Sequence, residues 1–140
     1  GHHGGAAYSA GKAALYGFMR ALHVEGFSRG ILSNAICPYA ATSMTAAYLV
    51  PDLAEMMDPA LVAPVAAWLA SDACTVSGEV FISGCGRLRR ARMELSPVRE
   101  IPSRDPDQDA MTALIATLMQ DECSLSFRNA QEDFAHFIKT

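Results

Sequence analysis

Hydrophobic residues recur at helical spacing near the start of the chain. Between about residues 9 and 26, Leu15, Phe18, Met19 and Leu22 fall three or four positions apart, which predicts a helix with one buried stripe. A second helix face consists of small residues, and either another helix or the domain's own sheet could approach it closely. Its members are Ala10, Ala13, Gly17 and Ala21.

Two short apolar runs predict strands, and a helix is predicted between them. Residues 31–37 form a run of strand length that Pro38 stops, and residues 79–83 form a second run. Between them, Asp58 and Pro59 are typical of a helix start, as N-cap and first residue. Strand, crossover helix and strand predict a right-handed unit with parallel strands, and hence an α/β fold. The expected buried stripe of this helix is Leu61, Val62, Val65, Ala66 and Leu69.

The segment 39–58 is rich in alanine, methionine and hydroxyl side chains. Thr42, Ser43 and Thr45 follow the carboxyl end of the first strand, where open α/β sheets bind their ligands. The apolar side chains of the segment could line an adaptable pocket or could pack as a small helix. They are Met44, Tyr48, Leu49, Leu53, Met56 and Met57.

A pair of glycines and then a basic cluster follow the second strand. Gly84 and Gly86 do not begin a dinucleotide-binding loop, because the position of the third glycine holds Arg89. The arginines favour a solvated tail over contact with ligand phosphates. Residues 93–110 are interpreted as a linker and residues 111–140 as a helical tail. The basic cluster consists of Arg87, Arg89, Arg90 and Arg92.

Composition narrows the function classes. With 140 residues, 51% of them hydrophobic, the chain can fold around a core. A net charge of -4 opposes general nucleic-acid binding, and no apolar run reaches the ~20 residues of a membrane span. The four cysteines are scattered, so reduced thiols in a cytoplasmic protein are expected. No metal site is expected, because His2 and His3 have no third ligand nearby.

Tyr8 and Lys12 are the candidate catalytic residues. Four positions apart on a helix, their side chains share one face. A phenol titrates near pH 10, and an ammonium group beside it favours the phenolate, as general acid–base catalysis near neutral pH requires. By itself this spacing more often marks an ordinary helix surface.

The order of the motifs resembles the C-terminal half of the short-chain dehydrogenase/reductase family. Tyr8 and Lys12 open a helix, Asn34-x-x-x-Pro38 lies in a strand, and Val76-Ser77-Gly78-Glu79 leads into the next strand. Residues 34–45 are most similar to the hydroxyacyl-CoA dehydrogenase domain of peroxisomal multifunctional enzymes and their bacterial relatives. The resemblance covers residues 4–92. It implies that residues 1–92 form the C-terminal part of a Rossmann-like, doubly wound parallel sheet, with additional C-terminal helices after it.

The resemblance also implies roles for particular residues. Tyr8 would exchange a proton with the substrate oxygen, while Lys12 would stabilise its phenolate and bind the nicotinamide ribose of NAD or NADP. The nicotinamide end would be held by Pro38, Ala41 and Thr42. The substrate, an apolar alcohol or ketone or an acyl thioester, would contact Tyr39, Met44 and Tyr48. Tyr39 departs from the glycine often found after this proline.

In the family, the glycine-rich phosphate loop and the catalytic Asn and Ser precede the tyrosine. Only seven residues precede Tyr8, so a truncated chain that is inactive alone is expected. The resemblance implies a homodimer or tetramer formed through the Tyr8/Lys12 helix. The alternative function is a non-catalytic remnant that serves as a dimerisation module. A nucleotide-sugar epimerase shares the Tyr/Lys spacing but fits residues 34–45 poorly.

Overall fold

The computed structural model describes residues 3–45 and 49–139, which divide into two compact units, Gly1–Ala91 and Arg92–Thr140. The helices and strands of the first unit are α1 (Ala6–Gly26), β1 (Ala35–Tyr39), α2 (Pro51–Met56), α3 (Ala63–Leu69), β2 (Val80–Gly84) and β3 (Arg87–Ala91). The second unit contains α4 (Gln108–Leu118) and α5 (Ala130–Phe137).

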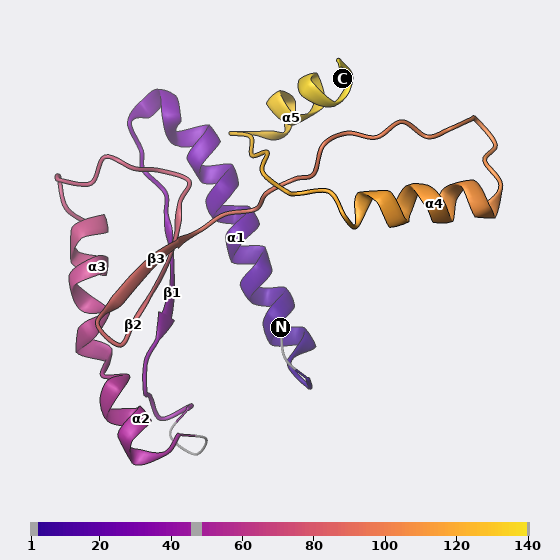
Figure 1. The fold of residues 1–140 in the computed structure, drawn as a ribbon. Coiled ribbons are helices and arrows are strands. Elements are labelled where there is room, and N and C mark those ends of the chain that lie inside the picture. The colour runs from indigo at the N-terminus through magenta and orange to yellow at the C-terminus, as the bar shows by residue number, and fades with distance from the viewer. Residues whose placement is uncertain (1–2, 46–48, 140) are drawn as a thin grey trace. The chain divides into compact units, whose positions relative to one another are not determined.

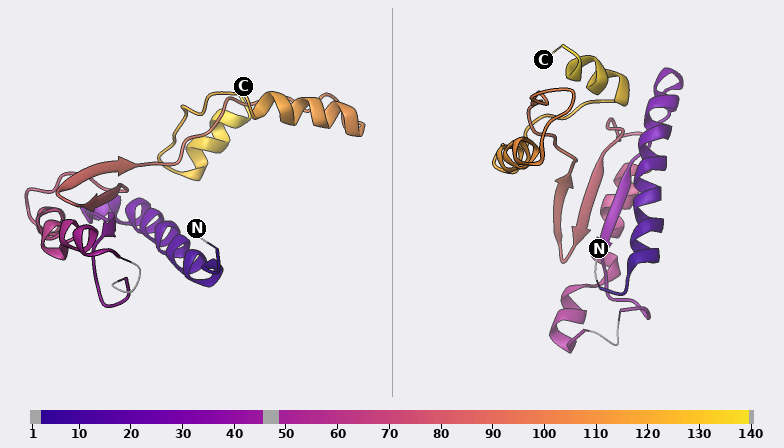
Figure 2. Two further views of the ribbon diagram at one scale, coloured as in Figure 1. Left: turned by 60° about the horizontal axis from the view of Figure 1, so that its bottom comes forward. Right: turned by 90° about the vertical axis from the view of Figure 1, so that its right-hand side faces the viewer.

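The first unit is built around a three-stranded sheet in the order β1-β2-β3. β1 and β2 are parallel, in register from Ala35 opposite Val80 to Tyr39 opposite Gly84. α1 and α3 lie on opposite sides of the strands, as Figures 1 and 2 show. The predicted α/β architecture with a parallel strand pair is therefore confirmed.

β1 contains the proline that was expected to end it. The strand begins at Ala35, later than predicted, and continues through Pro38 to Tyr39. A proline has no amide hydrogen to donate to a ladder, so it is tolerated where a strand lies at the edge of a sheet. β1 is an edge strand of the described sheet, which explains why Pro38 does not stop it.

A hairpin joins β2 to β3, an antiparallel strand that the hydrophobic pattern did not predict. The two loop residues are Cys85, with φ 52, and Gly86, with φ 65. Two successive residues in the left-handed region are the geometry of a type I′ turn, whose twist matches that of the flanking strands. Three arginines of the cluster interpreted as a solvated tail, Arg87, Arg89 and Arg90, thus belong to a strand of the sheet, although they remain exposed.

Much of the predicted apolar stripe of α1 is not buried. Of its four members only Met19 is buried, whereas Leu15 and Phe18 are 57% and 62% exposed and Leu22 is also exposed. The predicted stripe of the second helix is likewise at most half-buried, and that helix is divided into a 3-10 turn, Pro59–Leu61, and α3. Another protein surface could pack against these exposed apolar faces.

The start of this divided helix was predicted correctly. Asp58 accepts a hydrogen bond from the backbone amide of Ala60 at 2.8 Å, so its carboxylate caps the 3-10 turn. A capping carboxylate satisfies an amide that has no partner within its own turn.

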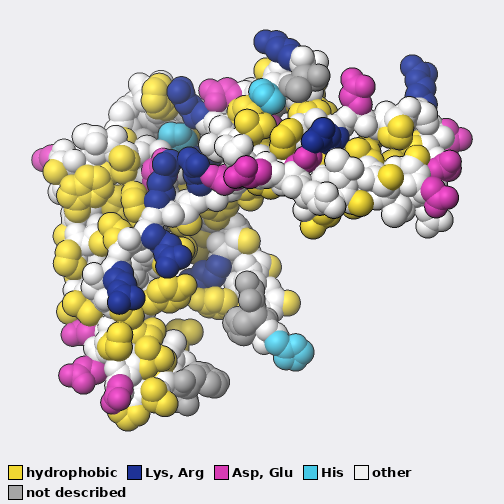
Figure 3. Space-filling model, viewed as in Figure 1, with side chains coloured by type: hydrophobic (Ala, Val, Ile, Leu, Met, Phe, Trp, Pro, Cys, Tyr) yellow, Lys and Arg dark blue, Asp and Glu magenta, His cyan; other side chains and the backbone are white. Residues whose placement is uncertain are grey.

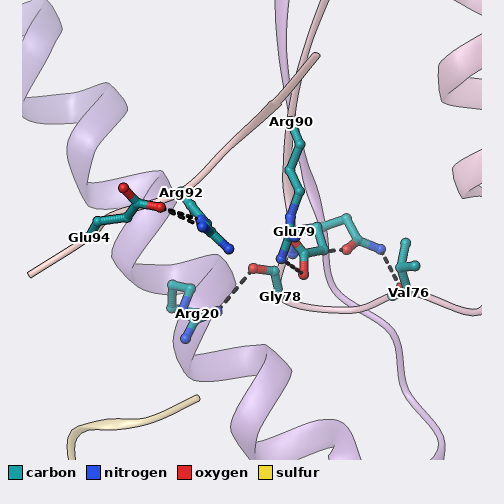
Figure 4. A network of polar contacts seen from close by, with 8 residues as sticks. Arg20, Val76, Gly78, Glu79, Arg90, Arg92 and Glu94 are labelled. Atoms are coloured by element: carbon teal, nitrogen blue, oxygen red, sulfur yellow. Dashed lines mark hydrogen bonds and ion pairs between the residues drawn. The ribbon is translucent and has the colours of Figure 1, made fainter. Parts of the chain in front are cut away.

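The loop that enters β2 is fixed to α1 by two polar contacts. The Arg20 guanidinium donates to the carbonyl oxygen of Gly78 at 3.0 Å, as Figure 4 shows. The Nδ1 atom of His23 lies 2.9 Å from the hydroxyl of Ser77. His23 is buried, so this contact satisfies a polar ring that would otherwise lose its hydration.

Asn34 holds the same loop from the segment before β1. Its side-chain amide donates to the carbonyl oxygen of Val76 at 2.8 Å, and its side-chain oxygen accepts from the backbone amide of Glu79 at 3.1 Å. One residue therefore joins the entrances of both parallel strands, which is a structural role for the asparagine of the Asn-x-x-x-Pro motif.

Gly78→Ala is expected to loosen the contact between α1 and this loop. Gly78 has φ +81, and an added Cβ would lie 2.8 Å from the His23 ring. We expect the free energy of unfolding to fall by about 2 kcal/mol, from the left-handed conformation and the displaced ring together.

Gly30→Ala is the matched control for Gly78→Ala. Gly30 has φ +68, but an added Cβ there would meet no atom within 4 Å. Urea unfolding of both variants separates the cost of displacing the His23 ring from the cost of the left-handed backbone conformation. Equal losses of unfolding free energy in the two variants would show that the contact with His23 contributes nothing.

The second unit has its own polar framework. Asp107 and Asn129 cap α4 and α5 through their side-chain oxygens. Arg99 makes two hydrogen bonds to the carboxylate of Asp121, at 2.6 and 2.9 Å, and they lower the pKa of Asp121. Because this pKa is lowered by folding, the stabilising contribution of the pair is present above the ordinary carboxyl pKa and is lost as the pH falls below it.

Candidate functional site

The structure brings Tyr8 and Lys12 together at the start of α1. The Lys12 ammonium nitrogen lies 5.3 Å from the centre of the Tyr8 ring, within the range of a cation–π interaction. Both residues are exposed, Tyr8 by 57%. A phenol and an ammonium group on one exposed helix face can meet a ligand together.

The loop after β1 is held by its own hydrogen bonds. The backbone amide of Ala41 donates to the carbonyl oxygen of Met57 at 2.7 Å, so it is already used within the protein. The amide of Thr42 donates to the hydroxyl of Thr45 at 2.9 Å, and the two threonine hydroxyl oxygens lie 3.4 Å apart. Thr42 is exposed, so its hydroxyl can still contact a ligand.

The predicted substrate residues do not form one group in the structure. Tyr39, 59% exposed, lines a hollow of about 520 Å³ at the carboxyl ends of β1 and β2. Met44 is 76% exposed and is not among the residues that line this hollow, while Tyr48 lies outside the described residues. The other lining residues are Ile82, Gly84, Cys85, Arg87, Leu88 and Arg89.

The hairpin supplies part of this hollow, and the hydrophobic pattern did not predict that part. The sequence does contain a signal for this hairpin. It is a two-residue loop with a glycine, followed by five residues that could alternate between the two faces of a strand. Gly84 ends β2 and Gly86 lies in the hairpin turn, which agrees with the rejection of a dinucleotide-binding loop at these glycines.

The described residues contain neither a metal-binding cluster nor a helix that could span a membrane. No three His, Cys, Asp or Glu side chains gather there as metal ligands would. No described helix is both long enough and apolar enough to cross a membrane.

Comparison with known sequences connects the chain to dehydrogenases. No protein-family model matches it. It is 37% identical over 93 residues to a Mycobacterium tuberculosis protein described as a short-chain type dehydrogenase/reductase, a match that covers 66% of this chain and 32% of that protein. It is also 37% identical over 94 residues to the mouse peroxisomal multifunctional enzyme type 2, covering 67% of this chain and 13% of that enzyme. The chain thus spans about a third of the mycobacterial relative.

Solved structures show the same fold. The full-length peroxisomal multifunctional enzyme type 2 of Drosophila melanogaster superposes with a TM-score of 0.73 at 23% identity, over 94% of this chain and 25% of that one. The superposed 94% of this chain is more than the first unit contains, so the similarity in fold extends into Arg92–Thr140. A short-chain dehydrogenase from Mycobacterium avium superposes with a TM-score of 0.65 at 26% identity, over 85% of this chain and 38% of that one. Over about two thirds of its length, the chain is therefore similar in sequence to short-chain dehydrogenases/reductases, and it shares their fold.

Proposed function

We propose that the protein carrying this chain is an NAD(P)-dependent oxidoreductase that interconverts a secondary alcohol and its ketone. The observation that carries the proposal is the pairing of Tyr8 and Lys12, with 5.3 Å between the ammonium nitrogen and the ring centre, on an exposed face of α1. The relatives, which are short-chain dehydrogenases/reductases and multifunctional enzymes, support the same reaction class.

In this mechanism, residues of this chain transfer the proton. Tyr8 donates a proton to the carbonyl oxygen during reduction, or accepts one from the hydroxyl during oxidation. The Lys12 ammonium stabilises the phenolate that Tyr8 becomes after it gives up the proton. A nicotinamide nucleotide, when bound, would supply or accept the hydride.

The described residues fit the nicotinamide end of such a cofactor in part. Lys12 can donate to ribose hydroxyls, and Thr42 offers an exposed hydroxyl at the carboxyl end of β1. Ala41 can contribute only its carbonyl oxygen, because its amide is bound to Met57.

The substrate class that we propose is a 3-hydroxyacyl thioester or a similarly extended apolar alcohol. The segment after β1 exposes apolar side chains that could contact an acyl chain, namely Met44, Leu53 and Met56. A related protein of Neurospora crassa is named a peroxisomal hydratase-dehydrogenase-epimerase, a name that pairs a dehydrogenase with a hydratase.

A second candidate function is that of a non-catalytic interaction module. The observation that favours it is the exposed stripe of Leu15, Phe18 and Leu22 on α1. Burying such side chains against another helix would stabilise an assembly by about 1.5–3 kcal/mol for each one fully covered. A dimer or tetramer through α1 is compatible with both functions.

Two properties of the 140-residue chain by itself can be measured directly, namely its self-association and its affinity for NADH. Its one glycine-rich turn between described strands is the hairpin at Cys85, and it precedes a strand rather than a helix N-terminus that could bind a diphosphate. We therefore expect light scattering to show self-association and titration calorimetry to show no NADH binding. Micromolar NADH binding by a monodisperse monomer would contradict both expectations.

Phe18→Asp tests whether α1 carries the self-association. It should give a monomer, because a charge cannot be buried in an apolar contact without a partner. Phe134→Asp is the matched control, since Phe134 is 65% exposed on α5. Equal effects of the two variants would show that α1 is not the interface.

A further inference from the structure

The arginines of β3 divide into two groups by the face on which they lie. Arg89 pairs in register with Ile82, and Arg87 pairs with Gly84, which itself pairs with Tyr39. Residues opposite one another in a ladder share a face, so these two arginines lie on the face of Tyr39. Arg90 alternates to the other face.

The two groups differ in their partners. Arg90 makes two hydrogen bonds to the carboxylate of Glu79, one of them at 2.7 Å, and this pairing raises the pKa of Arg90 (Figure 4). Arg92 is paired with Glu94 at 2.6 Å. Among the described residues, neither Arg87 nor Arg89 has an acidic partner, although the chain carries a net charge of -4.

The two unpaired arginines line the hollow beside Tyr39. Its volume of about 520 Å³ falls within the range of small-molecule sites. Ile82 gives it an apolar wall, and Tyr39 offers both a ring face and a hydroxyl. Basic and hydrophobic side chains lie next to each other over β3 in Figure 3.

Two guanidinium groups two positions apart on a strand suit a phosphate group. Their Cα atoms are about 6.6 Å apart, so both side chains can reach one anion. A phosphate monoester carries a charge of about -1.5 to -2 near pH 7 and offers three acceptor oxygens, which match the planar donors of arginine.

We propose that Arg87 and Arg89, with Tyr39 and Ile82, bind the phosphate monoester of a nucleotide-bearing ligand. The inference rests on the proposed function for the identity of that ligand, which is either the carrier portion of an acyl thioester or a phosphorylated nicotinamide nucleotide. Both present a nucleotide phosphate monoester to the same two cations.

The test compares ligand pairs that differ by one phosphate group. Titration calorimetry on the 140-residue chain uses coenzyme A against dephospho-coenzyme A, and NADP⁺ against NAD⁺, with a reductant because the cysteines are free. We expect at least tenfold tighter binding of the phosphorylated member of one pair. The pair that shows the preference identifies the source. No preference in either pair would overturn the proposal.

Charge variants locate the site. Arg87→Gln combined with Arg89→Gln should abolish the preference, whereas Arg90→Gln, which removes a charge from the opposite face, should change it less than twofold. An equal loss in both would mean nonspecific attraction and would overturn the proposal. Circular dichroism checks folding. If the double variant misfolds, each single variant should lower the preference at least threefold, and an unchanged preference in both would overturn the proposal.

These binding measurements do not depend on turnover. A protein whose turnover requires Tyr8 but which shows no phosphate preference would leave the proposed function standing and refute this site. The reverse result would support the site and refute the proposed reaction.

Discussion

Tyr8→Phe is expected to lower kcat by about 100- to 10,000-fold in the protein that carries this sequence, because the phenol hydroxyl is the proposed proton donor and acceptor. The ring remains, so the cation–π contact with Lys12 is retained. The dissociation constant of the nicotinamide nucleotide should change less than threefold. Steady-state kinetics and fluorescence titration with NADH or NADPH measure the two quantities.

Lys12→Met is the informative companion to Tyr8→Phe. It removes the charge that stabilises the phenolate and also the donor proposed for the ribose, so both kcat and nucleotide affinity should fall. Tyr16→Phe is the control, because Tyr16 lies on α1 two turns beyond Tyr8 and has no proposed role. Turnover by Tyr8→Phe close to that of the control would refute the assignment of Tyr8.

Gly84→Ala is expected to destabilise the first unit by about 3 kcal/mol. An added Cβ would collide with the backbone oxygen of Tyr39 and would lie 2.6 Å from the Tyr39 Cβ. The atom it meets is backbone, so no rotamer change can relieve the contact, and the carboxyl ends of β1 and β2 must move apart. The free energy of unfolding in urea measures the loss.

Gly86→Ala is the control for Gly84→Ala. Gly86 lies two positions away and has φ +65, but an added Cβ would meet no atom within 4 Å. It should lose only the backbone term, about 1 kcal/mol. A Gly84→Ala variant as stable as this control would show that β1 and β2 do not approach as closely as described.

Gly84 also connects stability to the candidate site. Gly84 and Tyr39 both line the hollow, and an added Cβ on Gly84 would meet Tyr39, so the displacement that destabilises the sheet would also move Tyr39. The phosphate preference proposed for Arg87 and Arg89 should therefore weaken in Gly84→Ala and persist in Gly86→Ala.

The parallel strand pair could be predicted because its signal is local. Two apolar runs of strand length on either side of a helix start at Asp58 admit few arrangements other than a parallel pair with a crossover. The Tyr8/Lys12 pairing was predictable for the same reason, since a four-residue separation on a helix fixes the shared face. In each case the geometry follows from residues close together in sequence.

The hairpin was missed because its signal was assigned to another motif. Two glycines just after a strand also occur in dinucleotide-binding loops, and a run of arginines beyond them is typical of a solvated tail. A left-handed conformation at Cys85 is uncommon for a residue with a side chain, so nothing at that position marked a type I′ turn. Only the pairing with β2 shows that Arg87 and Arg89 share a face with Tyr39.

The sequence by itself determined where the functional side chains lie along the chain, with a phenol and an amine on one helix face and a hydroxyl-rich loop after a strand. The order of these motifs also determined which family the chain resembles. Tertiary structure decided which groups already form hydrogen bonds within the protein and which side chains stay exposed. The Ala41 amide is bound to Met57, Asn34 joins the entrances of both strands, and Phe18 remains exposed. The physical reason is that periodicity fixes which residues share a face, whereas the burial and hydrogen bonding of that face depend on segments far away in sequence.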